Sequence, residues 1–243
     1  MSDDKIVNEK FAREIPAVLI AGGRPRDPAA MARMMSHAFA REASLQNAGI
    51  EKPVVAYIGT ANGDNPAFFQ MMKAMLKMAG AGKVVFVRLA KKNPDLDAAK
   101  NTLTNADVIF LSGGEVEDGM AWLKKHDLTG FLKGLYSSGK RFMGVSAGVI
   151  MMGTHWVHWD IEGDDSTSSL FDCLAFTPVI FDTHAEDENW IELKAALKLL
   201  GPGARGYGLP IGSMISADSR GTLVNLEKEY IVFVNEQGSI HVQ

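Results

Sequence analysis

The stretch Arg141-Phe-Met-Gly-Val-Ser146-Ala-Gly148 joins a short apolar run to the pattern Gly-x-Ser-x-Gly, and another apolar stretch follows it. This order is typical of a nucleophile elbow, a tight turn that links a buried strand to a helix. Small residues must flank the serine, because its backbone takes unusual angles while its hydroxyl projects above the edge of the sheet. The stretch therefore predicts an α/β fold with Ser146 as a candidate nucleophile. A tight packing turn with a serine N-cap would give the same pattern.

Short apolar runs alternate with longer amphipathic stretches in the part of the chain that precedes this turn. Such runs are typical of buried parallel strands, and the stretches between them are typical of crossover helices. We therefore expect a parallel sheet that is covered by helices on both faces. The expected strands are 17–23, 53–59, 83–89, 106–114 and 141–145, and the expected helices are 28–47, 66–79, 95–104, 116–125 and 128–137.

The alternation loosens after residue 155. A polar, acidic segment over 160–169 predicts a loop, an apolar run over 178–183 predicts a strand, and a helix is expected over 188–200. Three short runs near the end of the chain predict antiparallel strands. No long linker divides the sequence, so we expect one domain over 1–243. Its expected fold class is α/β, a three-layer, mostly parallel, doubly wound sheet with a small antiparallel C-terminal appendage at 221–225, 230–234 and 239–242.

The composition excludes several classes of function. Of the 243 residues, 47% are hydrophobic and 22% are charged, and the net charge of −4 offers no basic field for nucleic acid. No apolar run reaches the roughly 18–20 residues of a membrane span, and the polar first residues lack the apolar core of a signal peptide. The single cysteine, Cys173, excludes an internal disulfide, and no spacing of His, Asp and Glu indicates a metal site. We therefore expect a cytoplasmic protein with no cofactor, no metal, no nucleic acid and no membrane partner.

A second glycine turn, Ser112-Gly113-Gly114, ends the expected fourth strand. The carboxyl ends of parallel strands meet at one edge of a sheet, so this turn is expected to lie beside the elbow. The N–H groups of Gly114 and Ala147 would then point into the same space and hold an oxyanion. A plain strand-to-helix turn would also explain the glycines.

The base that activates a serine is most often a histidine, and the chain has six. His184 directly follows the strand expected over 178–183, so it reaches the same edge if that strand runs parallel to the fifth. His155 and His158 follow Ser146 closely in the sequence and remain alternatives. A structural, hydrogen-bonded role for His184 is the competing interpretation.

Three motifs stand in a characteristic order: Ser-Gly-Gly114 at a strand end, Gly-Val-Ser146-Ala-Gly, and Asp-Thr-His184 before a helix. In this order they resemble the aspartyl dipeptidase and cyanophycinase family of serine peptidases. That family has the class I glutamine amidotransferase-like fold, with serine in place of the amidotransferase cysteine. The resemblance implies Ser146 as nucleophile, His184 as general base, and the N–H groups of Gly114 and Ala147 as the oxyanion-binding pair.

The resemblance also implies an acid in the polar loop that follows the elbow helix. That loop contains Asp160, Glu162, Asp164 and Asp165. Their separation from Ser146 in the sequence favours Asp160 as the third member of the triad, with Glu162 as second choice. Each of these acids would serve equally well as a solvated loop residue.

The segment after His184 departs from the family. Family members that bind carboxylates usually have an arginine a few residues after the histidine, whereas this chain has three acids and no arginine in 185–190. Glu115 likewise follows the glycine turn. We therefore expect an acidic substrate pocket that includes Gly113, Glu115, and Glu186 or Glu188, and that suits a basic or amine-bearing substrate. Acids in the first turn of a helix also compensate its dipole, which is the alternative interpretation.

These observations predict a serine hydrolase that cleaves a small peptide or amide substrate. A catalytically silent, amidotransferase-like binding protein is the alternative, because the elbow would also persist as architecture. An esterase of the general α/β-hydrolase type fits less well, since only 38 residues separate Ser146 from His184. Trp156 and Trp159 alternate with histidines, a pattern that plain packing or the surface of a homodimer would explain.

Overall fold

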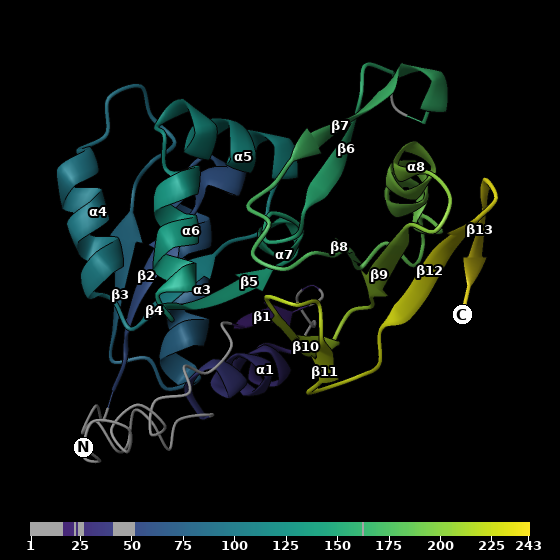
Figure 1. Ribbon diagram of the computed structural model, residues 1–243. Coiled ribbons are helices and arrows are strands. Elements are labelled where there is room, and N and C mark those ends of the chain that lie inside the picture. Colours follow the sequence, from purple (N-terminus) through teal and green to yellow (C-terminus); the bar gives the residue numbers. More distant parts are fainter. Residues whose placement is uncertain (1–16, 22, 24–26, 41–51, 162) are drawn as a thin grey trace, which may run out of the picture.

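The computed structural model describes residues 17–21, 23, 27–40, 52–161 and 163–243. Its largest sheet has seven strands (Figure 1). In spatial order the strands are β11 (Leu223–Asn225), β10 (Met214–Asp218), β1 (Ala17–Ala21), β5 (Arg141–Val145), β4 (Val108–Leu111), β2 (Val54–Ile58) and β3 (Lys83–Val87). Five adjacent strands, from β1 to β3 at one edge, pair in parallel, and two further strands extend the opposite edge through antiparallel pairings.

Helices cover both faces of this sheet. Along β2, Val55 and Tyr57 enter one hydrophobic cluster, and Ala56 and Ile58 enter the other, because successive side chains of a strand point to opposite faces. Burial on both faces explains why the parallel strands are continuous apolar runs. One face packs on α1 (Pro28–Ala40) and α3 (Pro66–Met78), and the other on α4 (Leu96–Asn105), α5 (Val116–Lys125) and α6 (Thr129–Ser137). The expected doubly wound α/β fold is thus confirmed.

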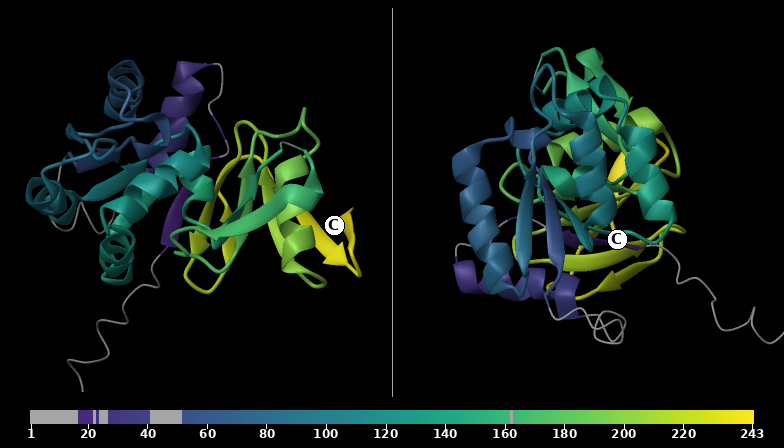
Figure 2. Two further views of the ribbon diagram at one scale, coloured as in Figure 1. Left: turned by 90° about the horizontal axis from the view of Figure 1, so that it is seen from above. Right: turned by 90° about the vertical axis from the view of Figure 1, so that its left-hand side faces the viewer.

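A second, four-stranded sheet lies beside the first one (Figures 1 and 2). Its first two strands pair in parallel and the remaining pairs are antiparallel. Phe181 and Phe233 of this sheet belong to the same hydrophobic cluster as Phe142 of β5, so one core is continuous between the two sheets. In sequence order the elements are β8 (Ile180–Thr183), α8 (Ile191–Leu200), β9 (Arg205–Leu209), β12 (Ile231–Glu236) and β13 (Ser239–Val242).

The strand expected over 178–183 therefore exists as β8, but it does not join the sheet of β5. It pairs with β9, whose sequence Arg-Gly-Tyr-Gly-Leu lacks the apolar continuity that would have predicted a strand. The antiparallel strand β10, which the sequence pattern also missed, occupies the edge beside β1.

The segment after the elbow forms an arm that projects from the body of the molecule (Figure 1). It is an antiparallel hairpin of β6 (His155–Trp159) and β7 (Ser168–Asp172), with the 3-10 turn η2 (Asp165–Thr167) before the second strand. The loop expected over 160–169 thus ends earlier than predicted, because its last residues pair with Trp159 and His158. The hairpin brings one wall to the site described next.

Candidate active site

Ser146 lies on a tight turn between β5 and the short helix α7 (Ala147–Ile150), as the sequence predicts. Its φ of 53° and ψ of −128° are strained for any residue other than glycine. The flanking glycines make this turn possible. A Cβ on Gly148 would lie 2.2 Å from the carbonyl oxygen of Leu111 in β4, and one on Gly144 would lie 2.7 Å from the oxygen of Gly148. The pattern Gly-x-Ser-x-Gly is therefore a steric requirement of this turn.

His184 reaches Ser146 from the second sheet. Its Nε2 lies 2.7 Å from the Ser146 Oγ, the distance of a good hydrogen bond. The histidine directly follows β8, where its N–H donates to the Leu209 carbonyl oxygen at 2.8 Å. Gly23 packs against the ring, since a Cβ there would approach the His184 Cδ2 to 2.8 Å. Of the three histidines that the sequence analysis considers, His184 is the one in contact with Ser146, whereas His155 pairs with Asp172 and His158 with Glu117.

The glycine turn after β4 passes directly beside the serine. A Cβ on Gly113 would lie 3.1 Å from the Ser146 Cβ, a tight contact that would require the serine to shift slightly. Gly114 has a φ of 142°, and a Cβ there would lie 2.0 Å from the Ala61 carbonyl oxygen. The backbone of this turn therefore packs between the elbow on one side and the turn η1 (Thr60–Asn62) on the other.

Asn62 holds this glycine turn in place, and the sequence analysis missed it. Its side-chain amide donates to the Gly113 carbonyl oxygen at 2.9 Å and to the Ser112 Oγ at 3.0 Å. The Tyr57 hydroxyl also donates to the Ser112 Oγ, at 2.7 Å. A signal was present, since Asn62 follows the second strand at the same sheet edge as the two glycine turns.

A cleft of about 320 Å³ opens beside Ser146 and His184. No lysine or arginine lines it in the part of the chain that the structure describes. Of the acids expected there, Glu115 and Glu188 line the cleft. Gly113, which was also expected in the pocket, does not line the cleft but lies next to Ser146, which does. Glu186 faces elsewhere and accepts the N–H of Ile211 at 2.9 Å. The acids that line the cleft are Glu115, Glu117, Asp182, Glu188 and Glu192.

Asp182 is the most deeply buried of these acids, with 2% of its surface exposed. Its Oδ1 accepts the N–H of Thr183 at 2.7 Å, whereas its buried Oδ2 has no hydrogen-bond partner among the described residues. Burial raises the pKa of this carboxyl to about 8, and the negative charges of Glu192 and Glu188 add to that effect, whereas hydrogen bonding from the backbone of Thr183 and of Leu193 in α8 lowers it. In the sequence, Asp182 stands out only as part of the motif Asp-Thr-His184.

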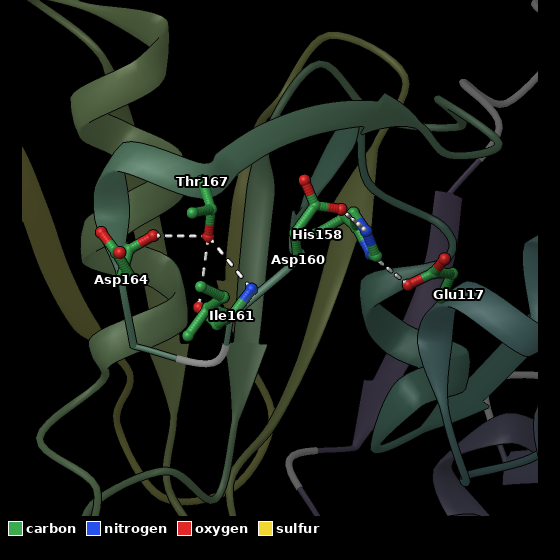
Figure 3. A network of polar contacts seen from close by, with 6 residues as sticks. All are labelled: Glu117, His158, Asp160, Ile161, Asp164 and Thr167. Carbon is green, nitrogen blue, oxygen red and sulfur yellow. Dashed lines mark hydrogen bonds and ion pairs between the residues drawn. The ribbon is translucent and has the colours of Figure 1, made fainter.

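The expected contact between Asp160 and His184 is not among the contacts of the described residues. Asp160 instead faces His158, with 3.4 Å between its Oδ1 and the histidine Nε2, because residues two apart on an extended strand share one face (Figure 3). Glu117 of α5 lies on the other side of the same ring, 2.7 Å from Nδ1. Glu162, the second choice for the acid, lies outside the described residues.

The contact between His158 and Glu117 ties the hairpin to α5 at the mouth of the cleft (Figure 3). Hydrogen bonding and charge attraction from Glu117 raise the pKa of His158. A raised pKa in the folded state means that the contact stabilises the fold below the unfolded pKa, and that this stabilisation disappears as the pH rises through the folded pKa.

We therefore expect the wild-type protein to have a higher Tm than the His158→Gln variant at about pH 5.5, and the same Tm at about pH 9. Thermal unfolding at the two pH values measures this, and Glu117→Gln should reproduce the result because it removes the partner. A Tm difference that is equal at both pH values would contradict the assignment.

Two further groups bear on the chemistry. Cys173 is buried, and burial raises the pKa of its thiol to about 12, so it carries no thiolate at neutral pH. Within the described ranges no group of three His, Cys, Asp or Glu side chains could hold a metal ion, and no helix is long and apolar enough to cross a membrane.

Comparisons with known proteins identify the fold and the family of the chain. A search of curated proteins found no match. Solved structures that share the fold at low sequence identity include the following two. A peptidase from an acI-B1 Actinobacterium has a TM-score of 0.65 and 16% identity, with 94% of each chain covered. A protein from Listeria monocytogenes EGD-e that carries the name peptidase E has a TM-score of 0.62 and 15% identity, covering 88% of this chain and all of the other.

The family comparison covers most of the chain. The model of peptidase family S51 matches residues 29–224, a range that contains the glycine turn at 112–114, the elbow, His184 and all five acids of the cleft. The resemblance that the three motifs predict is thereby confirmed. The chain belongs to peptidase family S51, and it is a serine-type peptidase with the class I glutamine amidotransferase-like fold.

Proposed function

We propose that this peptidase cleaves its substrate with Ser146 as nucleophile and His184 as general base. The observation that carries the proposal is the 2.7 Å distance between the Ser146 Oγ and the His184 Nε2 on a strained strand-to-helix turn. His184 takes the proton of the hydroxyl while Oγ attacks the scissile carbonyl carbon. The protonated ring then donates that proton to the leaving amine, and water hydrolyses the acyl-enzyme by the reverse transfers.

The N–H groups of Gly114 and Ala147 are the proposed donors to the oxyanion. Ala147 is the first residue of α7, directly after the serine, and Gly114 belongs to the turn that passes the Ser146 side chain. Both residues line the cleft. Fixed backbone donors stabilise the charge that develops in the tetrahedral intermediate without any reorganisation.

The proposed third member is a carboxylate from the start of the loop after β6, either Asp160 or Glu162. Such an acid orients the imidazole and stabilises its charged form. The continuous hydrophobic core between the two sheets supports the further proposal that they act as one peptidase domain, since the nucleophile comes from one sheet and the base from the other.

The competing function is a silent binding protein, and a fluorophosphonate probe separates the two. We expect the probe to form a covalent adduct on the peptide that contains Ser146, because an activated serine attacks phosphorus as it attacks a carbonyl. Mass spectrometry locates the adduct, and Ser146→Ala is the control that loses it. A protein that stays unlabelled, or that is labelled equally in Ser146→Ala, would contradict the proposed mechanism.

A further inference from the structure

Backbone hydrogen bonds fix the glycine turn beside Ser146 at both of its ends. The Ser112 N–H donates to the Ile58 carbonyl oxygen at 3.0 Å, and the Glu115 N–H donates to the Ala61 carbonyl oxygen at 2.6 Å. Neither bond involves the peptide group that joins the two glycines between these residues. That peptide group includes a proposed oxyanion donor, so its orientation has to be fixed in another way.

Steric contacts alone do not fix the orientation of this peptide group. A peptide plane rotates about the Cα atoms on either side of it, and side chains there restrict the rotation for most residues. Gly113 and Gly114 have no Cβ, and Gly114 has a φ of 142°, which other residues rarely adopt. The bond is trans, so its carbonyl oxygen and its N–H point in opposite directions. Rotation by half a turn would therefore exchange the donor and the acceptor.

Asn62 supplies the one hydrogen bond that the Gly113 carbonyl oxygen makes to a described residue, from Nδ2 at 2.9 Å. The amide of Asn62 is itself oriented, because its Oδ1 accepts the N–H of Asn65 at 3.1 Å. Since the carbonyl oxygen faces Asn62, the N–H of Gly114 points away from it. This N–H makes no hydrogen bond to a described residue, and Gly114 lines the cleft.

The other contacts of Asn62 are anchored in the core. Its Nδ2 also lies 3.0 Å from the Ser112 Oγ and 3.3 Å from the Tyr57 hydroxyl oxygen. Ser112 and Tyr57 are both fully buried, and the Tyr57 ring stacks on Phe110 with 5.7 Å between the ring centroids. A side chain with these partners has little freedom to turn, so it can hold the glycine peptide group in one orientation.

We propose that Asn62 is a positioning residue, which orients the peptide group between Gly113 and Gly114 so that the Gly114 N–H faces the oxyanion. The inference rests on the proposed function, because the oxyanion forms when Ser146 attacks a carbonyl. Asn62 acts through the glycine turn and not on the substrate itself. An oriented donor stabilises charge that develops in the transition state, so loss of Asn62 should slow the chemical step and leave ground-state binding unchanged.

The test measures how fast an alkyl fluorophosphonate labels the full-length protein, because its phosphoryl oxygen takes the place of the oxyanion. Saturation of the rate gives kinact for the chemical step and KI for binding of the probe. We expect Asn62→Ala to lower kinact by about 10- to 100-fold and to leave KI within about 2-fold. Asn62→Asp keeps the acceptor for the Asn65 N–H but cannot donate to Gly113, so it should be slowed at least as much.

Asn65→Ala is the matched control from the same turn. The Asn65 side chain caps α3, where its Oδ1 accepts the N–H groups of Ala67 at 2.9 Å and Phe68 at 3.1 Å. Loss of this cap should lower Tm, while kinact should stay at the wild-type value. Labelling that slowed as much in Asn65→Ala as in Asn62→Ala would mean that the stability of the turn is the cause, and the assignment of Asn62 would be overturned.

The pH dependence of labelling separates orientation of the donor from a general disturbance of the site. The rate rises with pH as His184 loses its proton, so the midpoint of the rise reports the base in contact with Ser146. We expect the same midpoint in the wild type and in Asn62→Ala, with a lower maximal rate in the variant. A shifted midpoint would show that the substitution disturbs the serine and the histidine, and would refute a role confined to the oxyanion donor.

The result can be told apart from a failure of the catalytic proposal. A wild-type protein that is labelled at Ser146, together with an Asn62→Ala protein that has the same kinact, would refute the role of Asn62 alone. A wild-type protein that stays unlabelled would refute both proposals.

Discussion

His184→Gln is expected to lower kcat/KM for peptide hydrolysis by at least about 10⁴-fold, because the Ser146 hydroxyl then has no base to accept its proton. Glutamine keeps a polar side chain at the end of β8 but cannot act as a base near neutral pH. The hydrogen bond of 2.7 Å between the serine and the histidine is the contact that the substitution removes. Hydrolysis of a small peptide substrate and the rate of fluorophosphonate labelling should fall together.

The control for this variant is His155→Gln. His155 follows Ser146 closely in the sequence, yet in the structure its Nε2 pairs with the Asp172 Oδ1 across the hairpin at 3.3 Å. We expect this variant to retain most of its activity. If His155→Gln lost activity and His184→Gln kept it, the base would have to be reassigned.

The third member of the triad is examined in the same assay with Asp160→Asn and Glu162→Gln. Substitution of the acid that orients His184 should lower kcat by about 10⁴-fold, because its negative charge is lost. Substitution of the other acid should change kcat little. Asp160 faces His158, so loss of its charge is also expected to alter the pH dependence of the hairpin contact.

The second large effect concerns the architecture of the elbow. Gly148→Ala should destabilise the fold by about 3 kcal/mol or more, because the added Cβ would lie 2.2 Å from the Leu111 carbonyl oxygen. The backbone of β4 is paired on both sides in the sheet and has little room to move. For a chain of this size such a loss lowers Tm by roughly 6–12 °C.

Gly134→Ala provides the matched control. Gly134 lies within α6, and nothing comes within 4 Å of a Cβ at that position. Alanine is the better helix former, so this variant should raise the free energy of unfolding by up to about 1 kcal/mol. Denaturant unfolding of both variants measures the difference. A Gly148→Ala protein as stable as the wild type would show that the elbow tolerates a larger residue and would refute the steric argument.

Acidic residues were the part of the site that sequence reasoning assigned least well. Glu115 and Glu188 line the cleft as expected, but Glu186 points to Ile211, and Glu192 replaces it in the cleft. All three glutamates near His184 stand close together in the sequence, where a pattern of charges does not tell which side chain points inward. The backbone conformation between β8 and α8 decides this, including a left-handed turn at Trp190.

Local patterns in the sequence by themselves determined the parallel sheet, its two layers of helices and the turn at Ser146. Each of these has a short local signature in the sequence: an apolar run for each strand that is buried on both faces, and small residues on either side of the serine. The motifs around Ser146, Gly114 and His184 were likewise short enough to be recognised one by one.

Only the tertiary structure decided how the two sheets meet. β8 pairs with β9, a glycine-interrupted strand without a sequence signal, and this pairing places His184 beside Ser146 from outside the main sheet. The same packing buries the Asp182 carboxyl beside the cleft and turns Asp160 toward His158. Strand partners and buried charges depend on residues far apart in the chain, and the free energy of such contacts is spread over many weak interactions that no single stretch of sequence records.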